Sequence, residues 1–448
     1  MHSESGKEET PLKKLDSRDI GRNALLSAIG NLALPLSTFL SAPLLARALG
    51  VDGRGELAAA TAPLMLALTI AMFGIPEALT FATAKASAAS LQGLRSGGVL
   101  LLLTGALAGI ATFFAAPLLS AGNQAVGQII QLTCVAIVPS VLLGAPRGLA
   151  SGMHRWNLVN LEKLLTGISR FGGTLATFLT GTLTVETATL FIAVAPIVGG
   201  LAYIGSIREL VRGPRTVTKE ARPANLAHYG FRMWLGSVSG ILLSRVAQLI
   251  MLPLAGPVAL GYFAVAVNIS DASLLLNNAI RDVTMSADAA DRSTPRLTAT
   301  ARISFLLSML GGIALAASLP LWFVPAFGSE FTGAIPSVLV LISVGVFGVP
   351  GSIAGAGLAA RGRPGLRSLS LFIALVFNVS VLVVLCPPLG ALGAAIATLT
   401  GSLIASNLNI HFLNRQHGTR FIDFYAIRGD DLRAAVRLSR RVLNMRGR

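Results

Sequence analysis

Long apolar stretches separated by short polar breaks recur along the chain from Ala24 to His411. Each stretch is long enough for an α-helix to cross the hydrocarbon core of a bilayer, which takes about 20 residues. The pattern predicts an all-α polytopic membrane protein. Its twelve predicted membrane-spanning helices cover residues 24–48, 57–83, 97–120, 127–149, 160–182, 186–207, 230–254, 258–281, 300–325, 332–360, 366–388 and 391–412.

Composition supports this fold class. Of the 448 residues, 53% are hydrophobic and 12% are charged, whereas about 25% are charged in an ordinary soluble domain. Mean hydropathy is +0.71. The two cysteines, Cys134 and Cys386, fall inside or at the edge of apolar segments, so no structural disulfide is expected. Soluble enzymes, nucleic-acid binders and secreted disulfide scaffolds are excluded.

The net charge of +16 is explained by membrane topology. With the amino end inside, the inner segments and their helix edges hold 32 of the 36 Lys and Arg residues, and Arg54 alone lies in an outer loop. Cytoplasmic loops of membrane proteins collect Lys and Arg, so both termini are predicted to be cytoplasmic. The first 22 residues are hydrophilic and lack the apolar core of a signal peptide. No nucleic-acid partner is expected.

The polar breaks also predict the domain organisation. We expect a cytoplasmic tail at 1–23, an N-lobe with helices 1–6 at 24–208, a cytoplasmic linker at 209–229, a C-lobe with helices 7–12 at 230–412, and a basic cytoplasmic tail at 413–448. In that last tail, residues 430–445 place apolar side chains near one helical face opposite several arginines. A helix at the anionic membrane surface and a solvated charged tail are equally open interpretations.

The two predicted lobes share a weak internal repeat. The glycine pair Gly50 and Gly55 after the first span recurs as Gly256 and Gly261 after the seventh, at an offset of 206 residues. Further matches at nearly the same offset follow in order along both halves. Six spans per half indicate a parallel repeat about an axis along the membrane normal.

Motifs of enzymes are missing from the sequence. The predicted outer loops are all short, no phosphate-binding G-x-x-x-x-G-K-[ST] loop is present, and neither H-E-x-x-H nor a Cys/His cluster occurs. These observations point to a transporter rather than an enzyme, with no metal site and no cofactor other than a coupling proton or sodium ion.

Several motifs resemble the polysaccharide-biosynthesis flippases, which are O-antigen and exopolysaccharide translocases of the MATE-like multidrug/oligosaccharidyl-lipid/polysaccharide superfamily. They are Pro43–Gly50 with Gly55, Trp234–Ser237, Gly261–Ala266, Gly357–Gly365 and Gly390–Thr398. The resemblance implies two six-helix lobes around a central cavity that opens alternately to each side. In one departure, Ala247 stands where family members often place an acid, two residues after Arg245.

The resemblance also implies a cargo. This is a polyprenyl-pyrophosphate-linked oligosaccharide, moved from the inner to the outer leaflet of the bacterial cytoplasmic membrane for lipopolysaccharide or exopolysaccharide synthesis. Membrane lipids, a polysaccharide polymerase and glycosyltransferases are the partners that would accompany it.

Polar residues inside spans are the candidate site, because charges in the bilayer are costly and are retained for function. The candidates for phosphate or sugar contacts are Arg245, Arg170, Arg47, Asn31, Asn277 and Asn278. For Arg245 the alternative is an ion pair with Asp271. For Arg170 it is a partner on a neighbouring helix or snorkelling to the inner surface, and for Arg47 it is snorkelling to the interface. For the asparagines, the alternative is hydrogen bonding between helices.

Three acids are candidates for a coupling ion or a charge pair: Asp271, Glu77 and Asp282. Asp271 is the deepest of them, and ion coupling and pairing with an arginine both stay open for it. Glu77 and Asp282 lie closer to the inner interface, where Lys85 and Arg281 can neutralise them. They are therefore predicted to be gate or topology charges.

Three other functions compete with the flippase. A cation-coupled multidrug or metabolite exporter of the same superfamily would share the fold and the repeat. A major-facilitator sugar transporter also has twelve spans, but the loop at 84–95 lacks that family's G-x-x-x-D-R-x-G-R-R motif. A transport-inactive scaffold would carry an added cytoplasmic domain, for which the carboxyl tail is too short.

Overall fold

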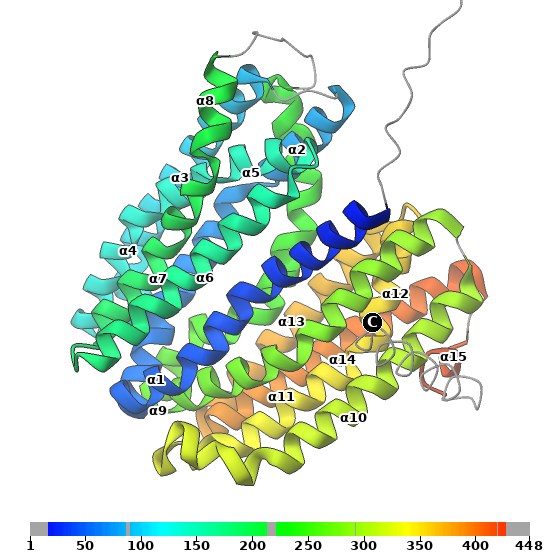
Figure 1. Ribbon diagram of the computed structural model, residues 1–448. Helices are drawn as coiled ribbons and strands as arrows, with labels where there is room; N and C mark the ends of the chain where they lie inside the picture. The colour runs from blue at the N-terminus through cyan, green and yellow to red at the C-terminus, as the bar shows by residue number, and fades with distance from the viewer. Residues whose placement is uncertain (1–16, 87–89, 213–220, 292, 419, 427–448) are drawn as a thin grey trace, which may run out of the picture.

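The structure is a computed structural model that describes residues 17–86, 90–212, 221–291, 293–418 and 420–426. Every regular element in these residues is a helix, as the apolar pattern predicts (Figure 1). The predicted interfacial segment at 430–445 lies outside the described residues.

The helices form two lobes joined along α1 and α9 (Figure 1). The first half of the chain contains α1 (Ser17–Met72), α2 (Ile75–Ala86), α3 (Leu91–Leu119), α4 (Gln124–Leu142), α5 (Gly144–Gly152), α6 (Trp156–Leu179), α7 (Val185–Gly199), η1 (Gly200–Tyr203) and α8 (Ile204–Arg212). The second half contains α9 (Pro223–Asp291), α10 (Thr294–Phe327), η3 (Ser329–Ala334), α11 (Ile335–Phe347), α12 (Val349–Ala360), α13 (Pro364–Leu389), α14 (Ala391–His417) and α15 (Ile422–Tyr425). The first turn of α9 therefore starts inside the predicted 209–229 linker.

The two longest helices, α1 and α9, are each a pair of helices joined by a tight turn. The turn residues are Gly50, with φ 65°, and Gly256, with φ 77°. Glycine takes up such left-handed backbone without the steric cost that a Cβ would bring. The two turns are 206 residues apart, so the repeated glycines of the sequence are confirmed as equivalent turn positions.

Nine stretches of the described helices are long and apolar enough to cross a membrane. Two of them, Leu32–Ala86 and Val238–Asp271, contain the turns at Gly50 and Gly256, so each of these two stretches provides two crossings. The 24-residue helix α6 adds one more. The arrangement thus accommodates the predicted twelve crossings, six in each lobe.

The two turns meet at one end of the molecule, which we call the closed end. A methyl group on Gly55 would overlap the carbonyl oxygen of Pro257, and one on Gly261 would overlap that of Val51. The contact is reciprocal, because 206 residues separate Gly55 from Gly261 and Val51 from Pro257. At the other end the lobes diverge, with α2, α5 and α8 on one side and α12 and α15 on the other (Figure 1). By the charge distribution, this open end is the predicted cytoplasmic side.

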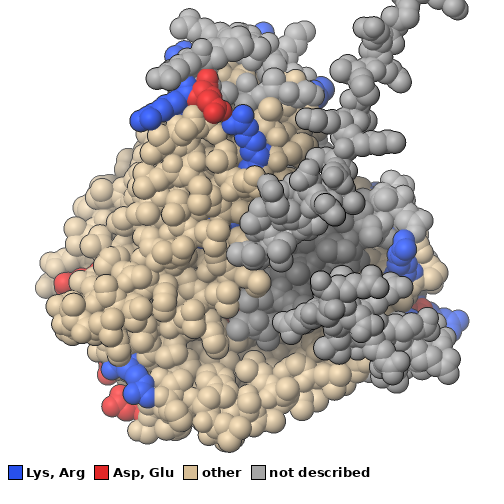
Figure 2. Space-filling view, in the orientation of Figure 1, with Lys and Arg blue, Asp and Glu red and all other residues tan. Residues whose placement is uncertain are grey.

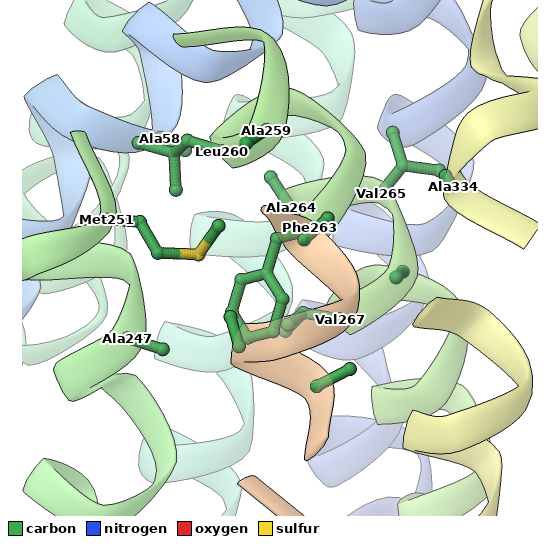
Figure 3. Packing of buried hydrophobic residues seen from close by; sticks show 14 of the residues in the cluster. Ala58, Ala247, Met251, Ala259, Leu260, Phe263, Ala264, Val265, Val267 and Ala334 are labelled. Atoms are coloured by element: carbon green, nitrogen blue, oxygen red, sulfur yellow. The ribbon is translucent and has the colours of Figure 1, made fainter. Parts of the chain in front are cut away.

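The largest hydrophobic core lies where the lobes join. Ala58 of α1 packs in one cluster with Leu260, Phe263 and Ala264 of α9 (Figure 3). Small side chains on both helices allow their backbones to approach closely, as is typical of helix contacts in membranes.

The first part of α9 also attaches to the first lobe near the open end. The indole Nε1 of Trp234 donates a hydrogen bond to the carbonyl oxygen of Ile70 at 2.9 Å, and the Tyr229 ring stacks on Phe81 with 4.8 Å between ring centroids. One continuous helical segment therefore contacts both lobes.

The outer surface is suited to a bilayer. Large apolar side chains such as Phe114, Leu118 and Leu321 are 77–80% exposed. Figure 2 shows a broad uncharged face whose charged side chains gather towards its ends and edges. Extended apolar surfaces of this kind are rare on soluble monomers. The chain is a multi-pass membrane protein.

Candidate functional site

The site is built around an ion pair between the two arms of α9. Arg245 lies 11 residues before Gly256 and Asp271 lies 15 residues after it, so the turn brings them side by side. At a rise of 1.5 Å per residue, Arg245 is about 16 Å from the turn, near the middle of a bilayer core about 30 Å thick. Its Nη2 lies 2.9 Å from Oδ2 of Asp271.

The protein does not enclose this pair. The side chains of Arg245 and Asp271 are 37% and 40% exposed, and Nη1 of Arg245 lies 3.5 Å from the amide oxygen of Gln248. The geometry is that of the ion pair considered as the alternative for Arg245. A pair that keeps this much exposure has room for a polar ligand beside it.

Arg170 of α6 brings a second positive charge to the same region. Its Nε is buried without a hydrogen-bond partner, and its guanidinium lies close enough to that of Arg245 for the two to repel each other. Arg170 comes from the first lobe and Arg245 from the second, so the two charges meet where the lobes face each other. Among the described residues, Arg170 has no ion pair.

Arg54 is a third arginine near Arg170, and its place differs from the predicted one. The sequence predicts an outer loop that contains Arg54, but only Gly50 forms the turn, and Arg54 already lies in the helix that follows it. Its side chain is only 4% exposed and its Nε has no hydrogen-bond partner. Arg170 lies near enough for its positive charge to repel that of Arg54. The internal repeat could have predicted this burial, because the residue equivalent to Arg54 in the second half is Leu260, an apolar residue that is fully buried.

Arg47 lies apart from the row, at the closed end. Its Nε donates to the carbonyl oxygen of Ala326 at 3.0 Å, and its Nη2 donates to that of Pro325. These bonds tie α1 of the first lobe to the end of α10 in the second. The structure therefore places Arg47 in a contact between the lobes, whereas the sequence suggested a phosphate or sugar contact, with snorkelling as the alternative.

The other candidates are not brought into the row. Glu77 is exposed in the first turn of α2, near the open end where α2 lies (Figure 1). The side chains of Asn31, Asn277, Asn278 and Asp282 lie outside the described part of the structure, and their roles stay predictions.

A separate charged network, not predicted from the sequence, lies within the first lobe. Glu162 of α6 is 3% exposed. Its carboxylate accepts hydrogen bonds from Nε of Arg147 at 3.0 Å and from the hydroxyl of Tyr203 at 2.6 Å. Because acid, base and hydroxyl satisfy one another, this network is suited to holding α5, α6 and η1 together.

The row formed by Arg54, Arg170 and Arg245 is chemically suited to anions. In the described part of the chain, one of its three positive charges forms an ion pair, that of Arg245 with Asp271. An unpaired charge in a low-dielectric interior is costly, and an anionic ligand would remove that cost. No group of three or more His, Cys, Asp or Glu residues able to hold a metal ion is found among the described residues.

Solved structures with this fold include flippases and transporters. One is described as lipid II flippase MurJ in an inward closed conformation (TM-score 0.68, 14% identity, covering 89% of each chain). Another is described as an inward-facing multidrug resistance MATE family transporter of the MOP superfamily (TM-score 0.66, 16% identity, 87% of this chain and 98% of the other). An outward-facing structure with the same family description gives a TM-score of 0.61 at 14% identity, covering 90% and 96%. At these identities the similarity shows the fold.

A search of curated proteins gives no match. A family model described as polysaccharide biosynthesis protein matches residues 20–284. This range includes Arg54, Arg170, Arg245 and Asp271, and it covers more than half of the chain. The chain therefore belongs to the polysaccharide biosynthesis protein family, as its motifs indicated.

Proposed function

We propose that the chain is a flippase for polyprenyl-pyrophosphate-linked oligosaccharides. It would move them from the inner to the outer leaflet of the bacterial cytoplasmic membrane by alternating access, for the synthesis of a surface polysaccharide. The observation that carries the proposal is the row of arginines that runs from Arg245, near the middle of the bilayer, to Arg54 at the closed end, in a chain of this family. Two of its members, Arg54 and Arg170, have no acidic partner among the described residues.

The cargo has chemistry that matches this row. A pyrophosphate cannot cross hydrocarbon without compensation for its charge, since polar groups left unsatisfied there cost several kcal/mol each. Arg245 and Arg170 would hold the phosphates by charge-assisted hydrogen bonds. The prenyl chain would stay in the lipid. The fold, closed where Gly55 and Gly261 pack and divergent at the other end, is suited to loading from the predicted cytoplasmic side.

Asp271 is the proposed coupling site for a proton or sodium ion. Neutralising Asp271 would release Arg245 from its ion pair and make its guanidinium available to a phosphate. Ion binding and cargo binding would then be linked through a single contact of 2.9 Å.

A cation-coupled multidrug exporter is the second candidate, because structures of similar fold are described as multidrug transporters. Cationic drugs need a site with excess negative charge. The described interior instead has excess positive charge at this depth, because the carboxylate of Asp271 is already paired with Arg245. The anionic cargo is therefore favoured.

The deciding experiment is lipid analysis of a deletion strain of the source organism. Polyprenyl-pyrophosphate-linked oligosaccharides are quantified by mass spectrometry, and surface polysaccharide is assayed alongside. The proposal predicts accumulated lipid-linked repeat units and lost surface glycan, both restored by the wild-type gene. Unchanged lipids and glycan in a strain without a second homologue would contradict it, and drug export would then be tested.

A further inference from the structure

Arg54 occupies an unusual position at the closed end. It directly precedes Gly55, whose Cα packs against the backbone of Pro257, so it lies beside the contact that joins the two lobes there. Its side chain is 96% removed from solvent and its Nε has no hydrogen-bond partner. A guanidinium in such surroundings requires a compensating group.

The acids nearest in sequence do not supply that group. Asp52 and Glu56 flank Arg54, yet neither forms an ion pair with it; Glu56 instead accepts a hydrogen bond of 3.4 Å from the side-chain amide of Asn123. The charged neighbour that Arg54 does have is Arg170, which carries the same sign. Two like charges brought together away from water repel each other, and the repulsion is relieved when an anion lies between them.

Packing does not require an arginine at this position either. In the second half of the chain the equivalent residue is Leu260, which is fully buried in the core cluster and lies next to Ala58 (Figure 3). The same turn and the same glycine contact are thus formed with an apolar side chain. The second half thus forms this contact without a charge at the position equivalent to Arg54.

We propose that Arg54 and Arg170 together form a second anion-binding site, at the closed end of the row, that takes a phosphate group of the cargo. This inference rests on the proposed function for the identity of the cargo. Arg170 lies within electrostatic reach of both Arg245 and Arg54, so it is shared by the two sites. A phosphate can then pass from Arg245 to Arg54 without losing contact with positive charge, and it would leave from Arg54 when the closed end opens.

The test measures binding of inorganic pyrophosphate to the purified full-length protein in lipid nanodiscs, by calorimetry and by the shift in melting temperature. The variants are Arg54→Leu, which copies the residue of the second half, and Arg54→Lys, which keeps the charge. Arg155→Leu is the matched control, because Arg155 forms an exposed ion pair with Glu209 away from the row. If Arg54→Leu does not purify, Arg54→Gln replaces it.

We expect Arg54→Leu to weaken pyrophosphate binding by roughly tenfold or more, as for the loss of a charge-assisted contact, while Arg54→Lys and Arg155→Leu bind nearly as the wild type does. Without ligand, Arg54→Leu should melt no lower than the wild type. Wild-type affinity in Arg54→Leu combined with weak binding in Arg170→Leu would overturn the role of Arg54 and leave the proposed function intact.

A failure of the proposed function, with the anion site retained, gives a different result. Binding that depends on Arg54, together with unchanged lipids in the deletion strain, would support the anion site and reject the oligosaccharide cargo. A wild-type protein that does not bind pyrophosphate would overturn the site, and the lipid analysis would still test the proposed function.

Discussion

Arg245 and Asp271 form an ion pair across the two arms of a single helical hairpin, with 2.9 Å between Nη2 and Oδ2. Within the pair, Arg245 neutralises the carboxylate of Asp271, which is the acid of the described interior at this depth. Arg54 and Arg170 are consequently left as excess positive charge, and the function proposed for the chain depends on this imbalance.

Neutralising Asp271 should strengthen anion binding. In Asp271→Asn the guanidinium of Arg245 loses its counterion, so pyrophosphate should bind severalfold more tightly than it does to the wild type. Calorimetry on the purified protein checks this. Asn407→Asp, a change at an exposed residue of α14, is a control for altered charge. Equal or weaker binding to Asp271→Asn would show that Arg245 does not contact the anion.

The same pair should contribute little to stability. Both side chains are more than one-third exposed, and exposed pairs contribute about 0–1 kcal/mol. A double-mutant cycle with Arg245→Gln and Asp271→Asn should therefore give a coupling free energy of about 1 kcal/mol or less. Melting temperatures of the four proteins provide the measurement. A much larger coupling would mean that the pair is a structural element rather than part of a ligand site.

Reversing the charge of Arg170 or of Arg245 should abolish transport. Arg170→Glu and Arg245→Glu place a carboxylate where the phosphates would bind, so neither should restore surface polysaccharide in the deletion strain. Arg155→Glu serves as the control, and membrane fractions show whether each variant is inserted. Full transport by normally inserted Arg170→Glu and Arg245→Glu proteins would refute phosphate binding at these residues.

Adding a single methyl group at the closed end should separate the lobes there. Gly55→Ala and Gly261→Ala each bring a Cβ into a backbone carbonyl of the opposite hairpin, so each should lower the melting temperature and reduce transport. Gly98→Ala is the matched control, because no atom lies within 4 Å of its added Cβ and alanine favours the helix. If all three variants behave alike, the contact does not hold the lobes together.

The network around Glu162 should support stability rather than transport chemistry. Tyr203→Phe removes a 2.6 Å hydrogen bond to a buried carboxylate, a loss of about 1.5–3 kcal/mol for a bond to a charged group. Tyr262→Phe removes a weaker, exposed bond of 3.2 Å to the carbonyl oxygen of Glu330 and should cost less. Comparing the two melting temperatures tests this, with pyrophosphate affinity expected to stay unchanged in both.

The parts of the site that depend on local chain geometry could be predicted from the sequence. The turns at Gly50 and Gly256 follow from glycine at equivalent positions of a repeat, and Asp271 could be considered as a partner of Arg245 because one short turn separates their helices. Arg54 was missed because two glycines five residues apart look like a loop, whereas a single glycine makes the turn.

Contacts between distant segments could not be predicted in this way. Arg47 bonds to the carbonyl oxygen of Ala326, which is 279 residues away, and no pattern of residue types marks a backbone carbonyl as its partner. Likewise, Glu162 and Tyr203 meet only because α6 and η1 pack together. Side-chain identity limits what each residue can bind, but the packing of the helices decides what it does bind.

The reciprocal packing of Gly55 on Pro257 and of Gly261 on Val51 has the form of an isologous interface, in which two identical surfaces meet across a two-fold axis. A homodimer of half-length chains would make the same contact. Because the contact is symmetric, a larger side chain at Gly55 or at Gly261 would clash with the backbone of the other hairpin. Functions that belong to one half alone are then expected at positions where the two halves differ. Arg54, which is equivalent to Leu260, is such a position.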